Sequence, residues 1–309
     1  MAKKGIDGRP RTGPTRYPGS KWGLWEWIRE YMAFPHQGFV DLFGGGGSIT
    51  ISKPPVKLRV YNDLDGDAVN FFRQARDNLS ELAWQLTMTP YSREEYQTAR
   101  VRLDSDTPLE RARKWFVSQW MATSQAPFSG QGFRHHPLPG GAYTPGEYAY
   151  VQAKMEMAKL SERFQGVVVD HMDALECIAH YEYDTVLIYA DPPYLRSTGR
   201  GVAYRVDTST NKADDKEFHY NLFQALSNAR GFKIVAGTES LEYAEWYEGA
   251  GWKRVDQKAS RGGVRKKSED MYVESMWLCP RVQEALAMDQ QPRLPLIDFI
   301  NQQTKDEEE

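Results

Sequence analysis

The chain has 309 residues, of which 40% are hydrophobic and 13% are aromatic, so it can bury one large core or two modest ones. Its formal net charge of −3 excludes a global basic field, so any nucleic acid must be held by a local basic patch. The two cysteines, Cys177 and Cys279, are too few for a disulfide scaffold or a cysteine-based zinc cluster. There is no run of about 18 apolar residues and no hydrophobic N-terminal segment, so we expect a cytoplasmic protein without a membrane partner.

The first 85 residues alternate helical and strand patterns. In chain order the predicted elements are a helix over 20–32, a strand over 38–43, a glycine turn over 44–48, a strand over 57–63 and a helix over 65–86. Residues 48–52 fit either a helix or a short strand. This alternation is typical of a parallel sheet covered by helices.

The middle of the chain, residues 86–160, has no strand signal. Helical patterns lie over 92–103, 108–125 and 147–164. An irregular stretch over 126–146 separates the last two, and structureless loops of this length are usually functional or disordered. We therefore expect a helical insertion within an α/β domain.

The α/β pattern then resumes. The predicted elements are strands over 166–170, 185–190 and 232–237, helices over 173–181 and 216–230, and an antiparallel pair over 251–259 and 270–279. The last thirty residues are polar and are expected to be frayed.

A glycine-rich loop follows the first predicted strand, in the sequence DLFGGGGS from Asp41 to Ser48. Glycines let a ligand approach the backbone, and amides at the start of a helix suit an anionic group. In open α/β sheets the ligand crevice lies at the carboxyl ends of the strands. A flexible turn is the alternative, because a glycine-rich loop alone is a weak signal.

Further acids follow the next predicted strands at the same edge. Asp63 is placed to accept hydrogen bonds from ribose hydroxyls, whereas Asp65 and Asp67 fit helix capping. Asp173 could cap the following helix or touch the adenine edge of the same ligand, and the two roles are compatible. Asp170 is its rival in that segment. Together these residues indicate a nucleoside ligand.

The sequence YADPPYL places Asp191, two prolines and Tyr194 directly after a buried strand. Prolines end a strand, so a structural stop is one reading. The alternative is group transfer to an amine, because the lone pair of an adenine amine is delocalised and needs activation. A carboxylate and the Pro192 carbonyl could accept its two hydrogens, while the Tyr194 ring stacks on the flipped base. A sulfonium methyl donor requires no metal.

Six segments in order resemble the Dam-type DNA adenine-N6 methyltransferases of bacteria and phages. They are RYPGSKWGLWEWI, FVDLFGGGGSI, VYNDLDGD, MDALECI, YADPPYL and RGGVRKKSEDMYV. In this family the cofactor motifs precede a target-recognition insertion and the catalytic motif. Leu42 stands where many relatives have proline, and Gly44 replaces a bulkier residue of some relatives.

The resemblance implies an α/β fold with a Rossmann-like S-adenosylmethionine-dependent methyltransferase core and a mixed, mostly parallel sheet. The core would comprise residues 16–85 and 161–282, with a helical target-recognition insertion over 86–160. Flexible tails are expected over 1–15 and 283–309.

The resemblance also implies roles for individual residues. The implied catalytic residues are Asp191, Pro192, Pro193 and Tyr194. The implied contacts to S-adenosyl-L-methionine are Tyr17, Lys21, Asp41, Phe43, Gly44, Gly45, Gly46, Gly47, Ser48, Asp63 and Asp173. By spacing alone, Lys21 would be an exposed lysine at a helix start.

Candidate DNA contacts lie in two segments. Arg134 and His135, in the irregular stretch, are candidates for reading base edges. A basic run between the last two strands would be either a solvated hairpin tip or a DNA contact; it comprises Arg261, Arg265, Lys266 and Lys267. No metal site is expected, because the adjacent histidines at 135 and 136 rarely ligate one ion together.

The sequence therefore predicts a site-specific enzyme that methylates N6 of a flipped-out adenine in double-stranded DNA. The alternatives are an RNA adenine methyltransferase, an enzyme acting on a protein amide, and a catalytically inactive DNA-binding relative. Amide-modifying enzymes more often have asparagine in place of Asp191. The sequence does not predict which DNA site is recognised or whether a restriction-modification partner exists. It also leaves the oligomeric state open, and a monomer is one option.

Overall fold

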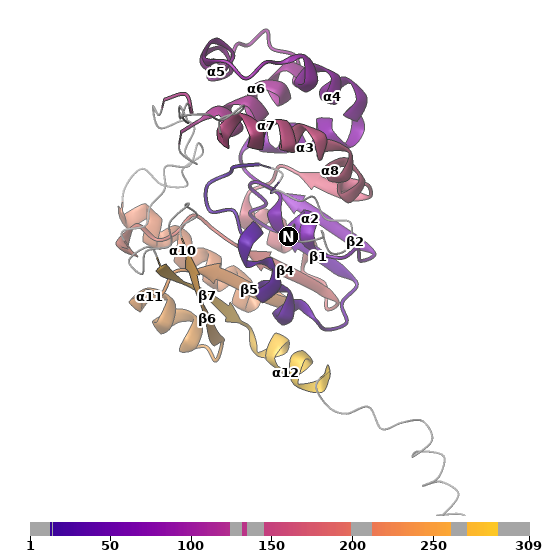
Figure 1. Ribbon diagram of the computed structural model, residues 1–309. Coiled ribbons are helices and arrows are strands. Elements are labelled where there is room, and N and C mark those ends of the chain that lie inside the picture. The colour runs from indigo at the N-terminus through magenta and orange to yellow at the C-terminus, as the bar shows by residue number, and fades with distance from the viewer. Residues whose placement is uncertain are drawn as a thin grey trace, which may run out of the picture.

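The computed structural model of the chain describes residue 13 and residues 15–123, 132–134, 145–198, 212–260 and 271–289 (Figure 1). Within these ranges seven strands form one sheet in the order β3-β2-β1-β4-β5-β7-β6. The strands are β1 (Gly38–Asp41), β2 (Leu58–Asn62), β3 (Val167–Asp170), β4 (Val186–Ala190), β5 (Phe232–Gly237), β6 (Lys253–Ser260) and β7 (Met271–Leu278).

Strands β1 to β5 are parallel, and β7 runs antiparallel between β5 and β6. The predicted mixed, mostly parallel sheet is therefore confirmed. The chain builds outward from β1 to β3 and then returns to add β4 on the other side of β1. This reversal creates a switch point between β1 and β4, where the loops after the two strands diverge and leave a crevice.

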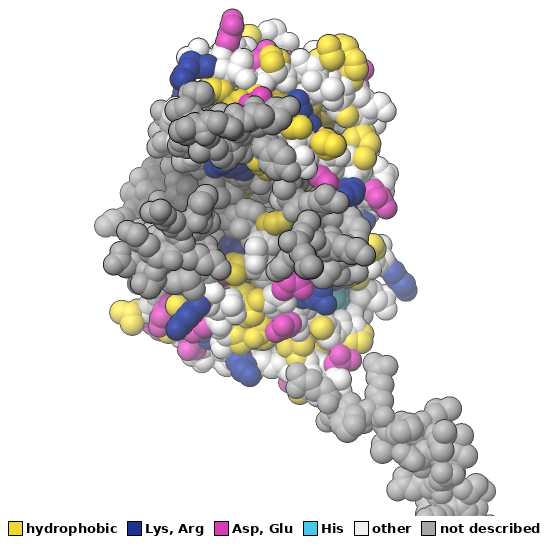
Figure 2. Space-filling model, viewed as in Figure 1, with side chains coloured by type: hydrophobic (Ala, Val, Ile, Leu, Met, Phe, Trp, Pro, Cys, Tyr) yellow, Lys and Arg dark blue, Asp and Glu magenta, His cyan; other side chains and the backbone are white. Residues whose placement is uncertain are grey.

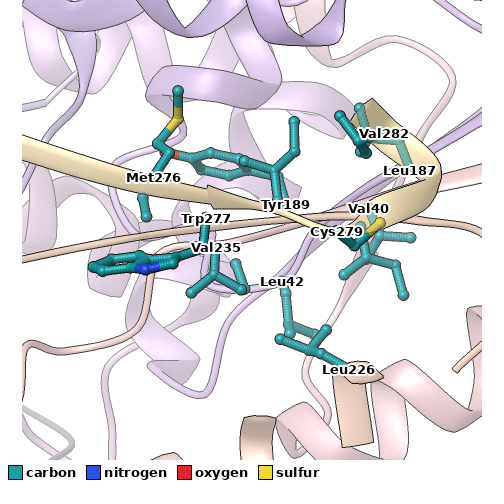
Figure 3. Close-up of a cluster of buried hydrophobic side chains, with 14 of the residues drawn as sticks. Val40, Leu42, Leu187, Tyr189, Leu226, Val235, Met276, Trp277, Cys279 and Val282 are labelled. Carbon is teal, nitrogen blue, oxygen red and sulfur yellow. The ribbon is translucent and has the colours of Figure 1, made fainter. Parts of the chain in front are cut away.

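The centre of the sheet is buried on both faces, as expected for parallel strands covered by helices. Every residue of β4 is buried. Figure 3 shows Val40 of β1, Leu187 of β4 and Val235 of β5 in one cluster with Trp277 of β7. This packing gives the loops at the carboxyl edge a rigid base.

The segment before β1 differs from the single helix predicted over 20–32. It forms three short pieces, η2 (Trp22–Leu24), α1 (Trp25–Ile28) and η3 (Arg29–Met32). Ser20 does not cap a helix, because its hydroxyl lies 2.9 Å from the hydroxyl of Ser48 in the next element. Residues Ser48–Ser52 form a helix, α2, which settles the alternative left open by the sequence.

The helix predicted over 65–86 is divided into α3 (Gly66–Asp77) and α4 (Leu79–Met88). Asn78 separates them with non-helical φ and ψ of −129° and 38°, and its side chain bonds the Gln74 side chain instead. Asp65 caps α3 by accepting the Asp67 N–H at 3.0 Å, as its position after a strand predicts.

The middle of the chain is helical, as predicted, with α5 (Arg93–Ala99), α6 (Pro108–Met121), α7 (Pro145–Met155) and α8 (Met157–Phe164). In Figure 1 the helices α4 to α7 lie at the top, above α3 and the sheet. They share a core with α3: Phe71 stacks on Trp115 at 4.7 Å and Phe72 on Phe164 at 4.5 Å. The helices are therefore joined to the sheet by continuous packing, and their separate recognition role stays a prediction.

The remaining helical elements cover the second half of the sheet. They are α9 (Ala174–Tyr181), η4 (Arg196–Thr198), α10 (Lys212–Asn228), α11 (Leu241–Tyr243), η5 (Ala244–Glu248) and α12 (Pro280–Asp289). Among the residues described, no helix combines the length and apolar content needed to cross a bilayer.

The flexible tails predicted over 1–15 and 283–309 extend too far into the folded part of the chain. Residues up to Asp289 form α12, because Val282 is fully buried in the core of Figure 3 and Gln283 donates to the carbonyls of Gly251 and Leu278. At the other end Thr15 is buried, and its hydroxyl donates to the Gly46 carbonyl at 3.4 Å. Residues 1–12 and 290–309 lie outside the described part.

Candidate active site

The predicted site residues meet at the carboxyl edge of the sheet. Asp41 is the last residue of β1 and is paired in register with Tyr61 of β2 and Tyr189 of β4. Asp63 follows β2, and Asp191 follows β4. The glycine loop and the Asp-Pro-Pro-Tyr turn therefore lie on the two sides of the switch point.

The glycine loop is held by β2 and the residue after it. The Gly44 N–H donates to the Asn62 carbonyl at 2.7 Å, and the Gly45 N–H donates to the Asp63 carboxylate at 2.7 Å. The Tyr61 hydroxyl donates to the Gly45 carbonyl at 2.8 Å. A Cβ atom on Gly44 would overlap the Tyr61 ring. Glycine at this position therefore allows the loop to lie directly on the β2 side chain.

The end of the loop turns into α2 through Gly47, whose φ of 70° favours glycine. The Ser48 hydroxyl meets the Ser20 hydroxyl, and Tyr17 is buried against the loop. Tyr17 and Ser48, both predicted cofactor contacts, thus support the loop, and direct contacts to a cofactor stay predictions for both.

Asp41 fixes the helix that follows the loop. One oxygen of its buried carboxylate accepts the Thr50 N–H at 3.1 Å and the Thr50 hydroxyl at 2.7 Å. Burial raises the pKa of Asp41 to about 7, against the opposing effect of the Thr50 hydrogen bonds. Asp41 therefore positions α2 relative to β1, and a direct cofactor contact stays a prediction.

Asp63 uses both oxygens to shape the turn after β2. Besides the Gly45 N–H, it accepts the Asp65 N–H at 2.7 Å. Burial raises the pKa of Asp63 to about 6, although the two backbone hydrogen bonds oppose the shift. A carboxylate has further lone pairs, so these bonds leave it able to accept from a ligand.

A pocket opens beside these residues. Its lining combines apolar side chains with acids: Leu42, Phe43, Asn62, Asp63, Leu64, Asp65, Met172, Asp173, Ala174, Pro193 and Phe218. Phe43 and Phe218 meet edge to face at 6.4 Å. Gly44 to Gly47 and Lys21 are absent from this lining.

Asp173 shows the first of its two predicted roles. It caps α9 by accepting the Leu175 N–H at 2.8 Å, and it also lines the pocket. Its rival Asp170 instead accepts the Tyr181 hydroxyl at 2.6 Å and does not line the pocket. An adenine contact from Asp173 stays a prediction.

Asn62 is a site residue that sequence reasoning missed. Its amide donates to the carbonyls of Leu42 and Met172 at 3.1 Å each, and its carbonyl accepts the Met172 N–H at 2.9 Å. It therefore ties together the loops after β1 and β3. The sequence signal for this role is an asparagine at the end of an apolar strand pattern, because a polar side chain buried there needs hydrogen-bond partners.

The catalytic candidate Asp191 is paired with Lys21. The Lys21 ammonium lies 2.7 and 2.6 Å from the two Asp191 oxygens, and 3.0 Å from the Tyr194 hydroxyl. The sequence groups Lys21 with the cofactor residues, but in the structure its ammonium lies against the Asp191 carboxylate. A cofactor contact from Lys21 stays a prediction.

Burial and the neighbouring charges have opposing effects on the pKa values of Asp191 and Lys21. Burial raises the pKa of Asp191 to about 6, because removing the carboxylate from water outweighs the opposing effect of Lys21. Burial alone would lower the pKa of Lys21, but the carboxylates of Asp191 and Glu274 raise it well above its ordinary value. Lys21 is therefore charged at neutral pH.

Glu274, on β7, was also missed. Its side chain is 2% exposed; one oxygen accepts the Tyr194 hydroxyl and lies 3.3 Å from the Lys21 ammonium. Its signal in the sequence is one acid among the apolar residues of MYVESMWL. Pro192 is buried and Pro193 lines the pocket, so the acid cluster and the pocket adjoin through one turn.

One predicted DNA contact can be placed. The N–H of Arg134 donates to the Met121 carbonyl at 2.7 Å, and its carbonyl accepts the Tyr91 hydroxyl at 2.6 Å. Arg16, which sequence reasoning missed, donates to the Ala122 carbonyl at 2.7 Å. Burial lowers the pKa of Arg16 to about 10, and the nearby charge of Arg134 adds to the shift. The charge of Arg134 is thus near enough to act on Arg16.

The other predicted DNA contacts fall outside the described residues: His135, Arg261, Arg265, Lys266 and Lys267. On the face seen in Figure 2, basic and acidic side chains of the described residues are interspersed. This is consistent with a small net charge and with a local rather than global basic surface.

The sheet order and the ligand pocket at its switch point are consistent with a Rossmann-like methyltransferase. The family described as D12 class N6 adenine-specific DNA methyltransferase matches residues 17–260, which is most of the chain. The protein belongs to this family and is an N6-adenine DNA methyltransferase, as the sequence predicts.

A curated relative extends this result. The chain is similar to the type II methyltransferase M1.LlaDCHI of Lactococcus lactis subsp. cremoris, with 23% identity over 274 residues. The alignment covers 85% of this chain and 92% of the relative. The family match favours DNA over the RNA alternative.

Proposed function

We propose that the protein is a site-specific enzyme that transfers the methyl group of S-adenosylmethionine to N6 of an adenine flipped out of double-stranded DNA. The observation that carries this proposal is the junction of two sites at Pro193. The pocket lies on one side of the turn, and Asp191 with Lys21 lies on the other. The similarity to a type II methyltransferase supports site specificity.

The pocket residues fit the adenosyl part of this cofactor. Phe43, Leu64 and Phe218 offer apolar surface to a base, and the Asp63 and Asp173 carboxylates can accept from ribose hydroxyls and an exocyclic amine. Bound there, the cofactor would supply an electrophilic methyl group on a sulfonium sulfur, which keeps the S–C bonding pair as N6 bonds the carbon.

Asp191 and the Pro192 carbonyl would hold the two hydrogens of the adenine amine. Accepting both favours a pyramidal nitrogen, whose lone pair is available for attack. The Tyr194 ring would stack on the base and keep it out of the duplex. As the new N–C bond forms, the amine loses one proton, and the Asp191 carboxylate is the nearest base to receive it.

Arg16 and Arg134 would contact DNA phosphates; this replaces the base-edge role that the sequence suggests for Arg134, because a second cationic side chain near it makes a local basic group. Arg16 joins the N-terminal segment to the residue after α6 through the Ala122 carbonyl, and the Arg134 backbone bonds Met121 at the same end of α6, so both would contact the duplex from this end of the helix. The basic run over 261–267 is proposed as the second phosphate contact.

The substitution Asp191→Asn tests the catalytic role. We expect single-turnover methylation to fall by at least about a hundredfold, because the amide cannot accept a proton and accepts fewer hydrogen bonds. Cofactor binding by calorimetry should be retained. Asp184→Asn is the matched control, since Asp184 precedes the same strand at its opposite end. An Asp191→Asn variant with wild-type turnover would refute the mechanism.

A further inference from the structure

The ammonium of Lys21 has more acceptors around it than it has hydrogens. Besides both oxygens of Asp191 at 2.7 and 2.6 Å, it has the Gly19 carbonyl at 3.1 Å and the Tyr194 hydroxyl at 3.0 Å. The Glu274 carboxylate lies at 3.3 Å. An ammonium has three hydrogens, so these contacts compete and the group can redistribute among them.

The observed arrangement conflicts with the role of Asp191. The carboxylate must accept a hydrogen of the adenine amine, yet Lys21 is bound to both of its oxygens. A neutral amine is a weaker partner for a carboxylate than an ammonium is. The carboxylate has lone pairs beyond those that Lys21 occupies, so the amine can be held, but it is held more strongly once the ammonium moves away from at least one oxygen.

Glu274 is the second carboxylate within ion-pair distance of Lys21 among the described residues. Its side chain is 2% exposed, and it projects from β7, which is paired on both sides by β5 and β6. An ammonium that left Asp191 without another counterion would be a buried unpaired charge, which is costly. A small movement of the ammonium toward Glu274 keeps it paired.

We propose that Glu274 is a positioning residue that takes the Lys21 ammonium when Asp191 accepts the adenine amine. This inference rests on the proposed role of Asp191. In the complex with DNA, Lys21 is paired with Glu274, and Asp191 is left as the acceptor for N6. Glu274 thus acts on the reaction through Lys21 without touching the substrate.

A double-mutant cycle tests this role. The variants are Glu274→Gln, Lys21→Met and their combination, and the duplex carries a site first identified by sequencing DNA methylated by the wild-type enzyme. Single-turnover rates are measured at saturating DNA and S-adenosylmethionine, with KM for DNA measured separately. Circular dichroism and cofactor binding report folding. If Glu274→Gln is unfolded, Glu274→Asp replaces it, since it withdraws the carboxylate by one methylene.

In the wild-type background, Glu274→Gln should lower the rate by at least about tenfold with little change in KM, because Lys21 then stays on Asp191. In the Lys21→Met background the same change should leave the rate unchanged or raise it, since no ammonium has to be displaced. An equal loss in both backgrounds would show a structural role and overturn the proposal. So would an unchanged rate in the wild-type background.

A binding measurement gives a second test that needs no turnover. Duplexes with adenine or 2-aminopurine at the target differ in the 6-amino group that Asp191 would hold. Wild-type enzyme should prefer adenine, and Glu274→Gln should lose most of this preference; an undiminished preference would contradict the proposal. If wild-type enzyme methylates DNA but Asp191→Asn does so equally well, the proposed mechanism fails first, independently of Glu274.

Discussion

Lys21 and Asp191 are 170 residues apart in the chain, yet the ammonium of one is held between both oxygens of the other. The contact joins the segment before β1 to the turn after β4. With the Ser20–Ser48 contact, it brings three separate segments of the chain to one edge of the sheet. The N-terminal segment therefore supplies the counterion of the Asp-Pro-Pro-Tyr turn.

The ring of Tyr194 and its hydroxyl should have separable effects. Tyr194→Ala removes the stacking surface and should lower methylation about 5- to 100-fold, since base stacking contributes about 1–3 kcal/mol. Tyr194→Phe keeps the ring and loses the bonds to Glu274 and Lys21, so its loss should be much smaller. Single-turnover rates compare the two. Equal losses would indicate that the hydroxyl, not stacking, carries the effect.

The activity should have an acid limb set by Asp191. Burial raises the pKa of this carboxyl from its ordinary 3.8 to about 6, and only the ionised form can take the proton that the amine releases. The kcat/KM for DNA should therefore rise with pH through about 6 and level off above it. A profile at constant ionic strength checks this. A flat profile between pH 5 and 7 would contradict it.

Asp41 should make the folded protein less stable as pH rises. Burial raises its folded pKa to about 7, so the native state binds a proton that the unfolded state releases above about 4. The stability from this group is complete at low pH and is lost as pH rises through 7. Urea unfolding of wild type and Asp41→Asn at pH 5 and 8 should show a smaller decrease in the variant. An equal decrease in both proteins would assign the pH dependence to other groups.

Gly44 should tolerate no side chain. A Cβ atom would overlap the Tyr61 ring, so Gly44→Ala should cost about 1–3 kcal/mol of stability and weaken cofactor binding. Gly23→Ala is the matched control, because its Cβ would meet no atom within 4 Å. Denaturant unfolding and calorimetry measure both quantities. Similar behaviour of the two variants would mean that the loop adapts.

Arg16 and Arg134 should contribute phosphate contacts. Each alanine substitution should weaken DNA binding at low salt and reduce the slope of log Kd against log salt concentration by about 1. Arg281→Ala is the control, since Arg281 pairs with Asp184 at the opposite end of β4. Fluorescence anisotropy over a salt series checks the slopes. Unchanged slopes in both variants would remove these residues from the DNA interface.

Local patterns predict the sheet well because its strands are short, apolar runs ended by glycine, proline or acid. Such patterns cannot predict the end of a helix when tertiary contacts determine it. Asn78 divides one predicted helix, and α12 continues beyond the predicted end at residue 282 to Asp289, anchored by the buried Val282. Both outcomes depend on neighbours that are distant in sequence.

The acids of the site could be predicted because each directly follows a strand of the sheet. Their partners could not: Glu274 is 80 residues from the Tyr194 that it bonds, and although it directly follows the segment RGGVRKKSEDMYV, nothing in that segment indicates its partner. Arg16 likewise follows a basic, glycine-rich segment, in which the spacing of residues does not predict what an arginine contacts. Pairings between charges on different elements follow from topology, which single-sequence patterns do not contain.

The most direct test is the position of the transferred methyl group. Double-stranded DNA is incubated with wild-type enzyme and S-adenosylmethionine carrying a labelled methyl, digested to nucleosides and analysed by mass spectrometry. The label should appear as N6-methyldeoxyadenosine at one sequence, and Asp191→Asn should yield almost none. Label on cytosine, or equal labelling by the Asp191→Asn variant, would contradict the assignment of this site.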